Sequence, residues 1–560
     1  MTDLEPDFVN RLWRKDVSLW DALPNQYDTI ANRLGWLDAD RWMLDNVTEI
    51  NDWIAEVVQL PWLERILLLG MGGSSMAPEV FASMFPRISG YPFLQVVDTT
   101  SPEQIRKAEG DLSRTLVIVS SKSGSTRETD DLCSYFFARM GECVDFPENH
   151  FVAITDSGSK LHEKAKHANF RKIFVNPSDI GGRYSALSYF GLIPAGLIGV
   201  DIQRLSDRVS AFCQEIKHSG VSASEHLHDA IRLGMVMGNA AVQGHILMTL
   251  RMDHVLSPLF VWIEQLIAES TGKMERGIVP VFEENDSTAK LPESLTRRDG
   301  MSIHMGMRKS QKWNISCSLK DVTASDIVAC PELETDLQWS VDDVYDLGVE
   351  FFRWEVATVV ASSCLGINPF DEPNVSEAKA STGLFIEGQK KLEQKPHYRD
   401  SFHDVFYDAD FNMPGDATDK TIGALYQNFI STAADDFYIG ILAYLPFSEE
   451  LDLKIKLLGK ILCEQSGIPV TLGYGPRYLH STGQLHKGGP TRCNFLQLVD
   501  DSSFDLDIPG RDYTFKELNK AQADGDFSVL ESRGRKIMRV VLKGDRLESM
   551  DQFLGMIAGE

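Results

Sequence analysis

The chain lacks several features that mark common classes of protein. It has only eight cysteines in 560 residues, and none of them belongs to a Cys-x-x-Cys motif. Neither a zinc site nor a disulfide framework is therefore indicated. No uninterrupted apolar run reaches the roughly 18 residues of a membrane-spanning helix, and the first residues lack the basic and apolar regions of a signal peptide. We expect a cytoplasmic protein that makes no membrane contact.

The sequence also lacks a basic run, and its formal net charge is −26 at pH 7. This charge argues against a general nucleic-acid binder, because it would repel the phosphate backbone. An anionic substrate must therefore be attracted by local groups. The composition, 43% hydrophobic and 24% charged, is that of a globular protein. At this length we expect two large domains.

Residues 65–176 have the pattern of a parallel sheet covered by helices. Apolar, β-branched segments alternate there with amphipathic helical segments. The predicted strands are 65–70, 93–97, 115–120, 150–155 and 172–175. Residues 7–58 have helical spacing of apolar and aromatic side chains and are expected to pack against this sheet. Ligands of such sheets lie beyond the carboxyl ends of the strands.

A second, weaker strand–helix series follows two helical stretches at 224–251 and 257–272. Its predicted strands are 277–282, 301–306, 439–444 and 470–473, and its predicted helices are 344–365, 376–392 and 447–466. The tail is predicted to contain a helix at 514–523, a strand at 537–542 and a helix at 546–557. We therefore expect an α/β protein with two related halves.

These patterns divide the chain into four predicted parts. They are an N-terminal helical segment at 1–60, a first α/β domain at 61–220, a second α/β domain at 221–505 with an insertion near 393–436, and a C-terminal extension at 506–560.

The most informative segment is 114–129. An apolar run from Leu116 to Val119 ends in a loop of hydroxyl residues, glycine and Lys122, and a helix is predicted to begin at Arg127. The N–H groups at a helix start lack partners and carry partial positive charge, so they attract anions. The pattern Gly-x-x-x-x-Gly-Lys-Ser/Thr is absent, which favours a small phosphorylated metabolite over a nucleoside triphosphate. The alternative is that Ser and Gly merely cap the helix.

Two further junctions have the same order of parts. At 65–79 an apolar strand leads through Gly72, Gly73 and two serines into a predicted helix, and glycine there permits a ligand to approach the backbone closely. At 176–186 a Gly-Gly-Arg-Tyr-Ser segment precedes an apolar helix. Because strand ends of a parallel sheet meet at one edge, we expect the turns within 65–79 and 114–129 to face a common crevice.

Two charged residues stand at positions that suggest chemistry. Arg183 follows two glycines and precedes a helix, where its guanidinium could reach the crevice; the alternative is a surface ion pair. Glu269 ends an otherwise apolar helical segment before Ser-Thr-Gly. A carboxylate at the end of a buried helix is unfavourable unless it is paired or serves as a base. The alternative for Glu269 is ordinary solvation near a helix end.

Lys379 and His480 are further candidates. Lys379 is predicted in the first turn of a helix that begins near Ser376, where a cation opposes the helix dipole. His480 and His486 lie in a segment dense in Gly, Ser, Thr and Gln, which core packing does not readily explain. A single His is more often structural than catalytic, and no further ligands suggest a zinc site for this pair.

Together these motifs resemble the phosphoglucose isomerase family, most closely the isomerase half of bifunctional transaldolase/glucose-6-phosphate isomerase proteins. The matching segments are Gly72–Ser74, Ser121–Thr126, Gly181–Ser185, Glu269–Lys273 and Asn368–Lys379. The resemblance implies two sugar-isomerase (SIS-type) parallel-sheet α/β domains with N-terminal helical and C-terminal α+β extensions. It also implies a homodimer and a functional link to transaldolase.

The family's activity would be the interconversion of glucose 6-phosphate and fructose 6-phosphate, with neither metal nor organic cofactor. The residues that the resemblance assigns to substrate binding are Gly73, Ser74, Ser121, Lys122, Ser123, Thr126 and Gln265. The hydroxyl groups would hold the phosphate, and the glycine turn would meet the sugar.

The resemblance also implies four catalytic roles. Glu269 would move a proton between C2 and C1, and Arg183 would stabilise the enediolate. Lys379 and His480 would open the sugar ring. In the commoner isomerases the ring-opening His precedes the Lys segment, but only His304 lies between Glu269 and Lys379 here. His480 follows the lysine, as in the transaldolase-fused relatives.

Three other interpretations stay open at this point. The protein could bind a sugar phosphate without catalysis, although this would not require Glu269, Lys379 and His480 together. It could isomerise mannose 6-phosphate, alone or with glucose 6-phosphate. It could also act chiefly as a subunit that docks to a separate transaldolase.

Overall fold

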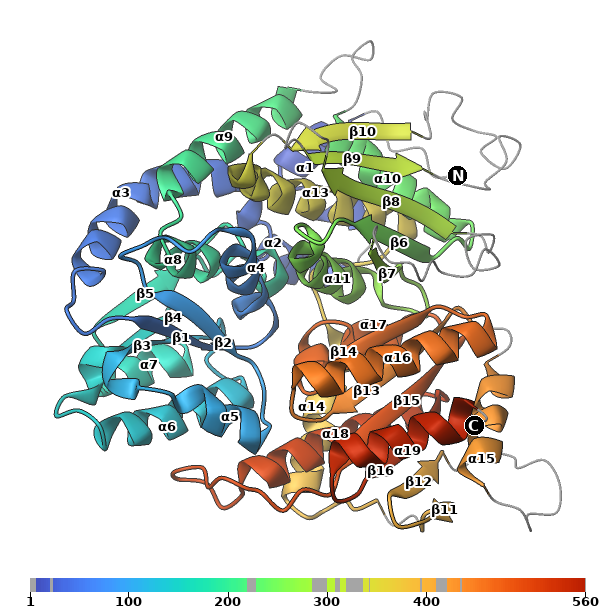
Figure 1. The fold of residues 1–560 in the computed structure, drawn as a ribbon. Helices are drawn as coiled ribbons and strands as arrows, with labels where there is room; N and C mark the ends of the chain where they lie inside the picture. The colour runs from blue at the N-terminus through green and yellow to red at the C-terminus, as the bar shows by residue number, and fades with distance from the viewer. Residues whose placement is uncertain are drawn as a thin grey trace.

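A computed structural model describes residues 7–20, 24–218, 228–284, 300–307, 313–318, 336–341, 343–392, 395–408, 421–433 and 436–558. Within them the chain forms three β-sheets surrounded by helices (Figure 1). The N-terminal helical prediction is confirmed by α1 (Phe8–Trp13), α2 (Tyr27–Ala31) and α3 (Ala39–Val57). None of the described helices is both long and apolar enough to cross a bilayer.

The first sheet is parallel throughout and has the order β2-β1-β3-β4-β5. Its strands are β1 (Arg65–Gly70), β2 (Phe93–Val97), β3 (Thr115–Ser120), β4 (Phe151–Asp156) and β5 (Lys172–Asn176), close to the predicted bounds. Alternate residues of β1 pack into different clusters, Leu68 on one face and Leu67 on the other. One face is covered by α4 (Met76–Met84) and α8 (Tyr189–Leu197), and the other by α5 (Pro102–Glu109), α6 (Arg127–Gly141) and α7 (Lys160–His167).

The second sheet corrects two predictions. The stretch 224–251 is not helical throughout, because α10 (Asp229–Val242) ends before Gly244, whose φ of +95° leaves the helical region, and β6 (Leu247–Met252) follows. The predicted strands at 277–282 and 301–306 become β7 (Val279–Glu284) and β8 (Gly300–Met307). With β9 (Trp313–Ser318) and β10 (Asp336–Val341) they form a mixed sheet of their own, in the order β10-β9-β8-β6-β7. They therefore do not share a sheet with the predicted strands at 439–444 and 470–473.

The third sheet has the order β11-β12-β16-β15-β13-β14. Its strands are β11 (Tyr398–Arg399), β12 (His403–Tyr407), β13 (Tyr438–Tyr444), β14 (Val470–Tyr474), β15 (Cys493–Asp500) and β16 (Lys536–Leu542). The four strands from β13 to β16 are parallel, and β12 pairs antiparallel with β16. Two segments predicted as peripheral, the insertion and the tail, thus both supply strands to this sheet.

Helices cover the third sheet on both faces (Figure 1). One face packs against α15 (Ile422–Thr432), α16 (Glu449–Ser466) and α19 (Arg546–Ala558), and the other against α17 (Gly483–Gly488) and α18 (Phe515–Ser532). A capping box between Thr514 and Glu517 fixes the start of α18. The predicted α/β class with parallel sheets and helical and α+β extensions is confirmed, whereas the domain bounds stay a prediction.

One long helix, α13 (Leu347–Leu365), is almost completely buried. Nearly every one of its residues is shielded from water, and α13 packs against α10 and α11 (Ser257–Thr271). The next helix, α14 (Pro373–Ile386), packs along α18. Helices α11 and α14 therefore place the segments around residues 269 and 379 next to the carboxyl edge of the first sheet.

Candidate functional site

Three loops at the carboxyl edge of the first sheet line one cavity of about 360 Å³. They follow β1, β3 and β5, and contribute residues 72–74, then 122, 123 and 126, and then 181–184. The chain leaves β1 toward β2 on one side and returns to β3 on the other, so the order of strands reverses between β1 and β3. Such a reversal opens a crevice in which α/β proteins bind ligands. The expected meeting of the turns after β1 and β3 is confirmed, and the turn after β5 joins them.

The glycines of the β1 loop are needed for packing between loops. A Cβ at Gly73 would lie 2.1 Å from the carbonyl oxygen of Gly182. A Cβ at Gly72, whose φ is +55°, would lie 2.6 Å from the carbonyl oxygen of His480. From the sequence, glycine is expected here because it lets a ligand approach the backbone closely. The structure gives a second reason, which is the close contact of three loops.

The loop after β3 presents its hydroxyl groups in different directions. Ser123 and Thr126 line the cavity, directly before α6 begins at Arg127. The Ser121 hydroxyl is buried 3.4 Å from the Thr126 hydroxyl. The loop therefore offers hydroxyl donors and a helix N-terminus to an anion in the cavity.

Lys122 is held by neighbours on one side of the cavity. Its Nζ lies 2.5 Å from a carboxylate oxygen of Asp156 and donates a hydrogen bond of 2.7 Å to the carbonyl of Ser178. Burial lowers the pKa of Lys122, while Asp156 acts in the opposite direction. The cation therefore adds positive potential to the cavity while it is tied to Asp156, a partner that sequence reasoning missed.

Arg183 and Glu269 meet in the wall of the same cavity. An Arg183 Nη1 lies 3.1 Å from Glu269 and 3.2 Å from Glu372, a second carboxylate that sequence reasoning missed. Gln265, one turn earlier on α11, donates to Glu269 at 3.2 Å. Arg183 is 5% exposed, so the interpretation as a surface ion pair is wrong.

The surroundings of Glu269 favour a basic carboxylate. Burial raises the pKa of Glu269 and Glu372 raises it further, whereas Arg183 lowers it without reversing the shift. Glu372 has the opposite balance: burial raises its pKa, but the nearby cations Arg183 and Lys273 lower it more. Two carboxylates whose pKa values are pushed apart are a common arrangement in acid–base catalysis.

His480 is oriented by a residue that the sequence analysis did not single out. Its Nε2 lies 3.0 Å from a carboxylate oxygen of Glu128, in the first turn of α6. Gln522 donates to the same Glu128 oxygen at 2.7 Å. Burial alone would raise the pKa of Glu128, but His480 and Lys379 lower it to about 2. A carboxylate paired with imidazole fixes the ring's orientation and tautomer, as it does in catalytic triads.

Part of the chain is similar to a known protein family. A sequence model of the phosphoglucose isomerase family matches residues 44–281, the region that contains the three loops, Arg183 and Glu269. This part of the chain matches the phosphoglucose isomerase family. The predicted resemblance is thereby confirmed at the level of the family.

Two named relatives match a larger share of the chain than the family model does. The probable glucose-6-phosphate isomerase of Methanococcus maripaludis is 27% identical over 64% of this chain and 86% of the relative. The glucose-6-phosphate isomerase of Rubrobacter xylanophilus is 26% identical over 59% of this chain and 84% of the relative. The solved glucose-6-phosphate isomerase of Chlamydia trachomatis aligns with a TM-score of 0.49 at 18% identity, over 69% of this chain and 78% of that one.

Lys379 lines the cavity, as the resemblance implies, but it does not lie at the predicted place in its helix. Helix α14 begins at Pro373, so Lys379 lies in its second turn. The argument that Lys379 opposes the helix dipole in the first turn is therefore wrong, since the dipole acts mainly on the terminal turn. The side chain nevertheless lines the cavity together with His480.

His486 has a structural environment. It is buried among Tyr438, Tyr478 and Phe495, and burial lowers its pKa well below the usual value. It is not among the residues that line the cavity. Within the described residues, no group of three or more His, Cys, Asp or Glu side chains is placed to hold a metal ion.

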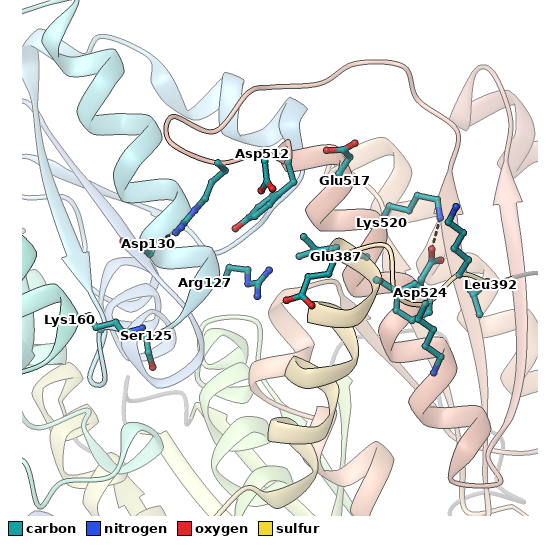
Figure 2. Close-up of a pocket in the computed structure, with 18 residues that line it drawn as sticks. Ser125, Arg127, Asp130, Lys160, Glu387, Leu392, Asp512, Glu517, Lys520 and Asp524 are labelled. Atoms are coloured by element: carbon teal, nitrogen blue, oxygen red, sulfur yellow. Dashed lines mark hydrogen bonds and ion pairs between the residues drawn. The ribbon is translucent and has the colours of Figure 1, made fainter.

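A larger cavity, of about 910 Å³, lies on the other side of the β3 loop. Gly124, Ser125 and Arg127 face it, and Figure 2 shows Arg127 directed toward Glu387 at the end of α14. Acidic and basic side chains alternate around this cavity, and it contains none of Arg183, Glu269 or His480. The smaller cavity is the better candidate site, because the loops, the carboxylate pair and the imidazole converge there.

Proposed function

We propose that this protein interconverts glucose 6-phosphate and fructose 6-phosphate, as an aldose–ketose isomerase. The main support is the position of Glu269. This buried carboxylate shares a cavity with the β3 loop and with His480. The reaction needs a base near C1 and C2 of a sugar whose phosphate is held some distance away. The names of the relatives in the phosphoglucose isomerase family support the same substrate.

The β3 loop is proposed to bind the phosphate group. Ser123 and Thr126 offer hydroxyl donors, and the free N–H groups at the start of α6 add positive potential. Lys122 contributes positive charge at the cavity wall. The buried Ser121 hydroxyl supports the loop through its contact with the Thr126 hydroxyl. Gly73 and Ser74, on the β1 loop, are proposed to contact the sugar.

His480 and Lys379 are proposed to open the ring. Ring opening requires a base that takes the proton of the O1 hydroxyl and an acid that gives one to O5. Both side chains line the cavity, and Glu128 holds the imidazole of His480 in place. General acid–base groups of this kind each contribute about 10²–10⁴-fold to the rate.

Glu269 is proposed to carry out the isomerisation itself. Its carboxylate would remove the proton at C2 and return it at C1, while Arg183 stabilises the negative oxygen of the enediolate. Gln265 positions Glu269 through its hydrogen bond. The raised pKa of Glu269 makes it a stronger base than an exposed carboxylate.

A coupled assay tests this proposal. Purified protein is given fructose 6-phosphate, and the glucose 6-phosphate formed is oxidised by an added dehydrogenase whose NADPH is recorded. Sustained turnover supports the proposal, and absence of product at high enzyme concentration contradicts it. Mannose 6-phosphate is run in parallel to determine whether the second hexose phosphate is also a substrate.

The assembly and location are proposed on the resemblance alone. Two chains are proposed to form a cytoplasmic homodimer that works in the same pathway segment as a transaldolase. Light scattering on the purified protein tests the dimer, and co-purification from the native host tests association with a transaldolase.

A further inference from the structure

The third sheet repeats the winding of the first. From β1 the chain passes to β2 on one side and then to β3 on the other. From β13 it passes to β14 on one side and then to β15 on the other. The order of strands therefore reverses between β13 and β15, as it does between β1 and β3. Crevices at such reversals are the usual ligand sites of α/β sheets, and the first sheet carries the proposed substrate cavity there.

A cavity of about 380 Å³ lies beside this second reversal. It is bordered by Tyr444 at the end of β13, by Val499 and Asp500 at the end of β15, and by Val541 near the end of β16. Helix α18 covers it from one side. The cavity shares no lining residue with the proposed substrate cavity, and its volume is similar.

The charged floor of this cavity is internally satisfied. Arg539 donates to Asp524 and Gln497 at 2.6 Å each, and to the carbonyl of Ala523 at 2.9 Å. Asp500 is paired with Arg546. These groups have no need of a further polar partner, so they shape the cavity without selecting a strongly charged ligand.

The rest of the lining is mainly apolar. Its polar side chains are those of Lys516 and of three residues that have partners, namely Asp501, Asn519 and Lys520. Three aromatic rings border the cavity, those of Phe406, Tyr444 and Phe527. Among the residues that the structure describes, no hydrogen-bond or ion-pair partner is found for the Lys516 ammonium. A flat apolar group between the rings, with a single negative charge at Lys516, would satisfy both features.

We propose that this cavity is a second ligand site, which binds a small aromatic or heteroaromatic molecule that carries one anionic group. The proposed site is separate from the substrate cavity, since the two cavities are lined by different residues. A ligand bound there contacts α18, whose Gln522 donates to Glu128 beside His480. Occupancy can therefore be communicated to the first cavity through one helix.

Two fluorescent probes test the site. 8-Anilinonaphthalene-1-sulfonate has the predicted chemistry, and N-phenyl-1-naphthylamine has the same rings without the charge. Titrations contain saturating fructose 6-phosphate, which occupies the substrate cavity. We expect both probes to bind the wild-type protein with saturable stoichiometry. We expect Lys516→Met to weaken the sulfonate about tenfold or more and to leave the neutral probe unchanged.

A second variant tests the apolar part. Val541→Trp fills the cavity and is expected to weaken both probes more than tenfold. The matched controls are Lys456→Met on α16 and Val175→Trp on β5, whose side chains are exposed at other places. Isomerase turnover and circular dichroism report whether each variant is folded. The proposal is overturned if the wild-type protein binds neither probe, or if Lys516→Met and Val541→Trp bind both probes as the controls do.

Discussion

Arg183 and Glu269 form an ion pair of 3.1 Å in which both side chains are almost fully shielded from water. The same guanidinium nitrogen lies 3.2 Å from Glu372. One cation therefore compensates two carboxylates, of which Glu269 has a raised pKa and Glu372 a lowered one. The arrangement keeps a buried basic carboxylate beside a cation that can also stabilise a developing oxyanion.

Glu269→Gln should remove most of the turnover while phosphosugar binding is retained. The amide keeps the size of the side chain but cannot accept a proton, so a loss of about 10²–10⁴-fold in kcat is expected. Turnover is measured by the coupled assay, and binding by calorimetry with a non-reacting sugar phosphate. Near-wild-type kcat in this variant would show that another group is the base.

Glu372→Gln should move the acidic limb of the pH–rate profile to lower pH. The negative charge of Glu372 raises the pKa of Glu269, so its removal lowers that pKa, and Glu269 stays deprotonated at lower pH. The measurement is kcat/KM for fructose 6-phosphate against pH. Glu377→Gln, which changes a half-exposed residue paired with Arg533 on the helix that follows Glu372, is the control. An unchanged acidic limb would mean that Glu372 does not influence the base.

Glu128→Gln should slow ring opening more than it weakens binding. The carboxylate that orients His480 is replaced by an amide of equal size, and a decrease of about 10–100-fold in kcat is expected, as for other residues that orient a functional imidazole. Glu142→Gln, just beyond the far end of the same helix, should leave kcat unchanged. Equal effects of the two substitutions would contradict a specific role of Glu128.

Ser123→Ala should raise KM for the substrate more than it lowers kcat. Ser123 lines the cavity, and a hydrogen bond to a charged phosphate contributes about 1.5–3 kcal/mol. Ser125 lies two residues further on the same loop but faces the larger cavity of Figure 2. Its hydroxyl lies 2.7 Å from that of Ser123, so Ser125→Ala should raise KM less than Ser123→Ala does. The opposite pattern would place the phosphate on the other side of the loop.

Gly73→Ala should destabilise the protein as well as inactivate it. The new Cβ would overlap the carbonyl of Gly182, so the loops must separate, and forced repacking of this kind lowers the free energy of unfolding by about 1–3 kcal/mol. Chemical denaturation measures the change. Gly182→Ala is the control, because its Cβ would meet no atom within 4 Å. If both variants were equally stable, the contact between the loops would not be tight.

The first sheet and its loops could be predicted because their signals are local. Strands β1 and β3 are apolar runs that are buried on both faces, and the turns after them have the composition of anion-binding loops. Arg183 and Glu269 could be singled out from their positions next to glycines and at a helix end. Their mutual distance could not, because it depends on how α11 packs against the loop after β5.

The sheet to which each later strand belongs could not be predicted from its local sequence. Strand β15 was not predicted, and β8 was placed in the wrong series, because sheet membership depends on pairing between distant segments. Glu128 was missed for a related reason. A glutamate in the first turn of a helix is ordinary, since it interacts favourably with the dipole, and its partner His480 is 352 residues away.

The separation of Glu128 and His480 by 352 residues in the sequence has a consequence for the folding of the enzyme. The first sheet contains the whole β3 loop, yet the imidazole it requires belongs to a segment synthesised much later. Contacts between such remote segments form slowly, because a long loop must close before they do. During synthesis or refolding, catalytic competence should therefore emerge as one of the last events, well after most secondary structure is in place.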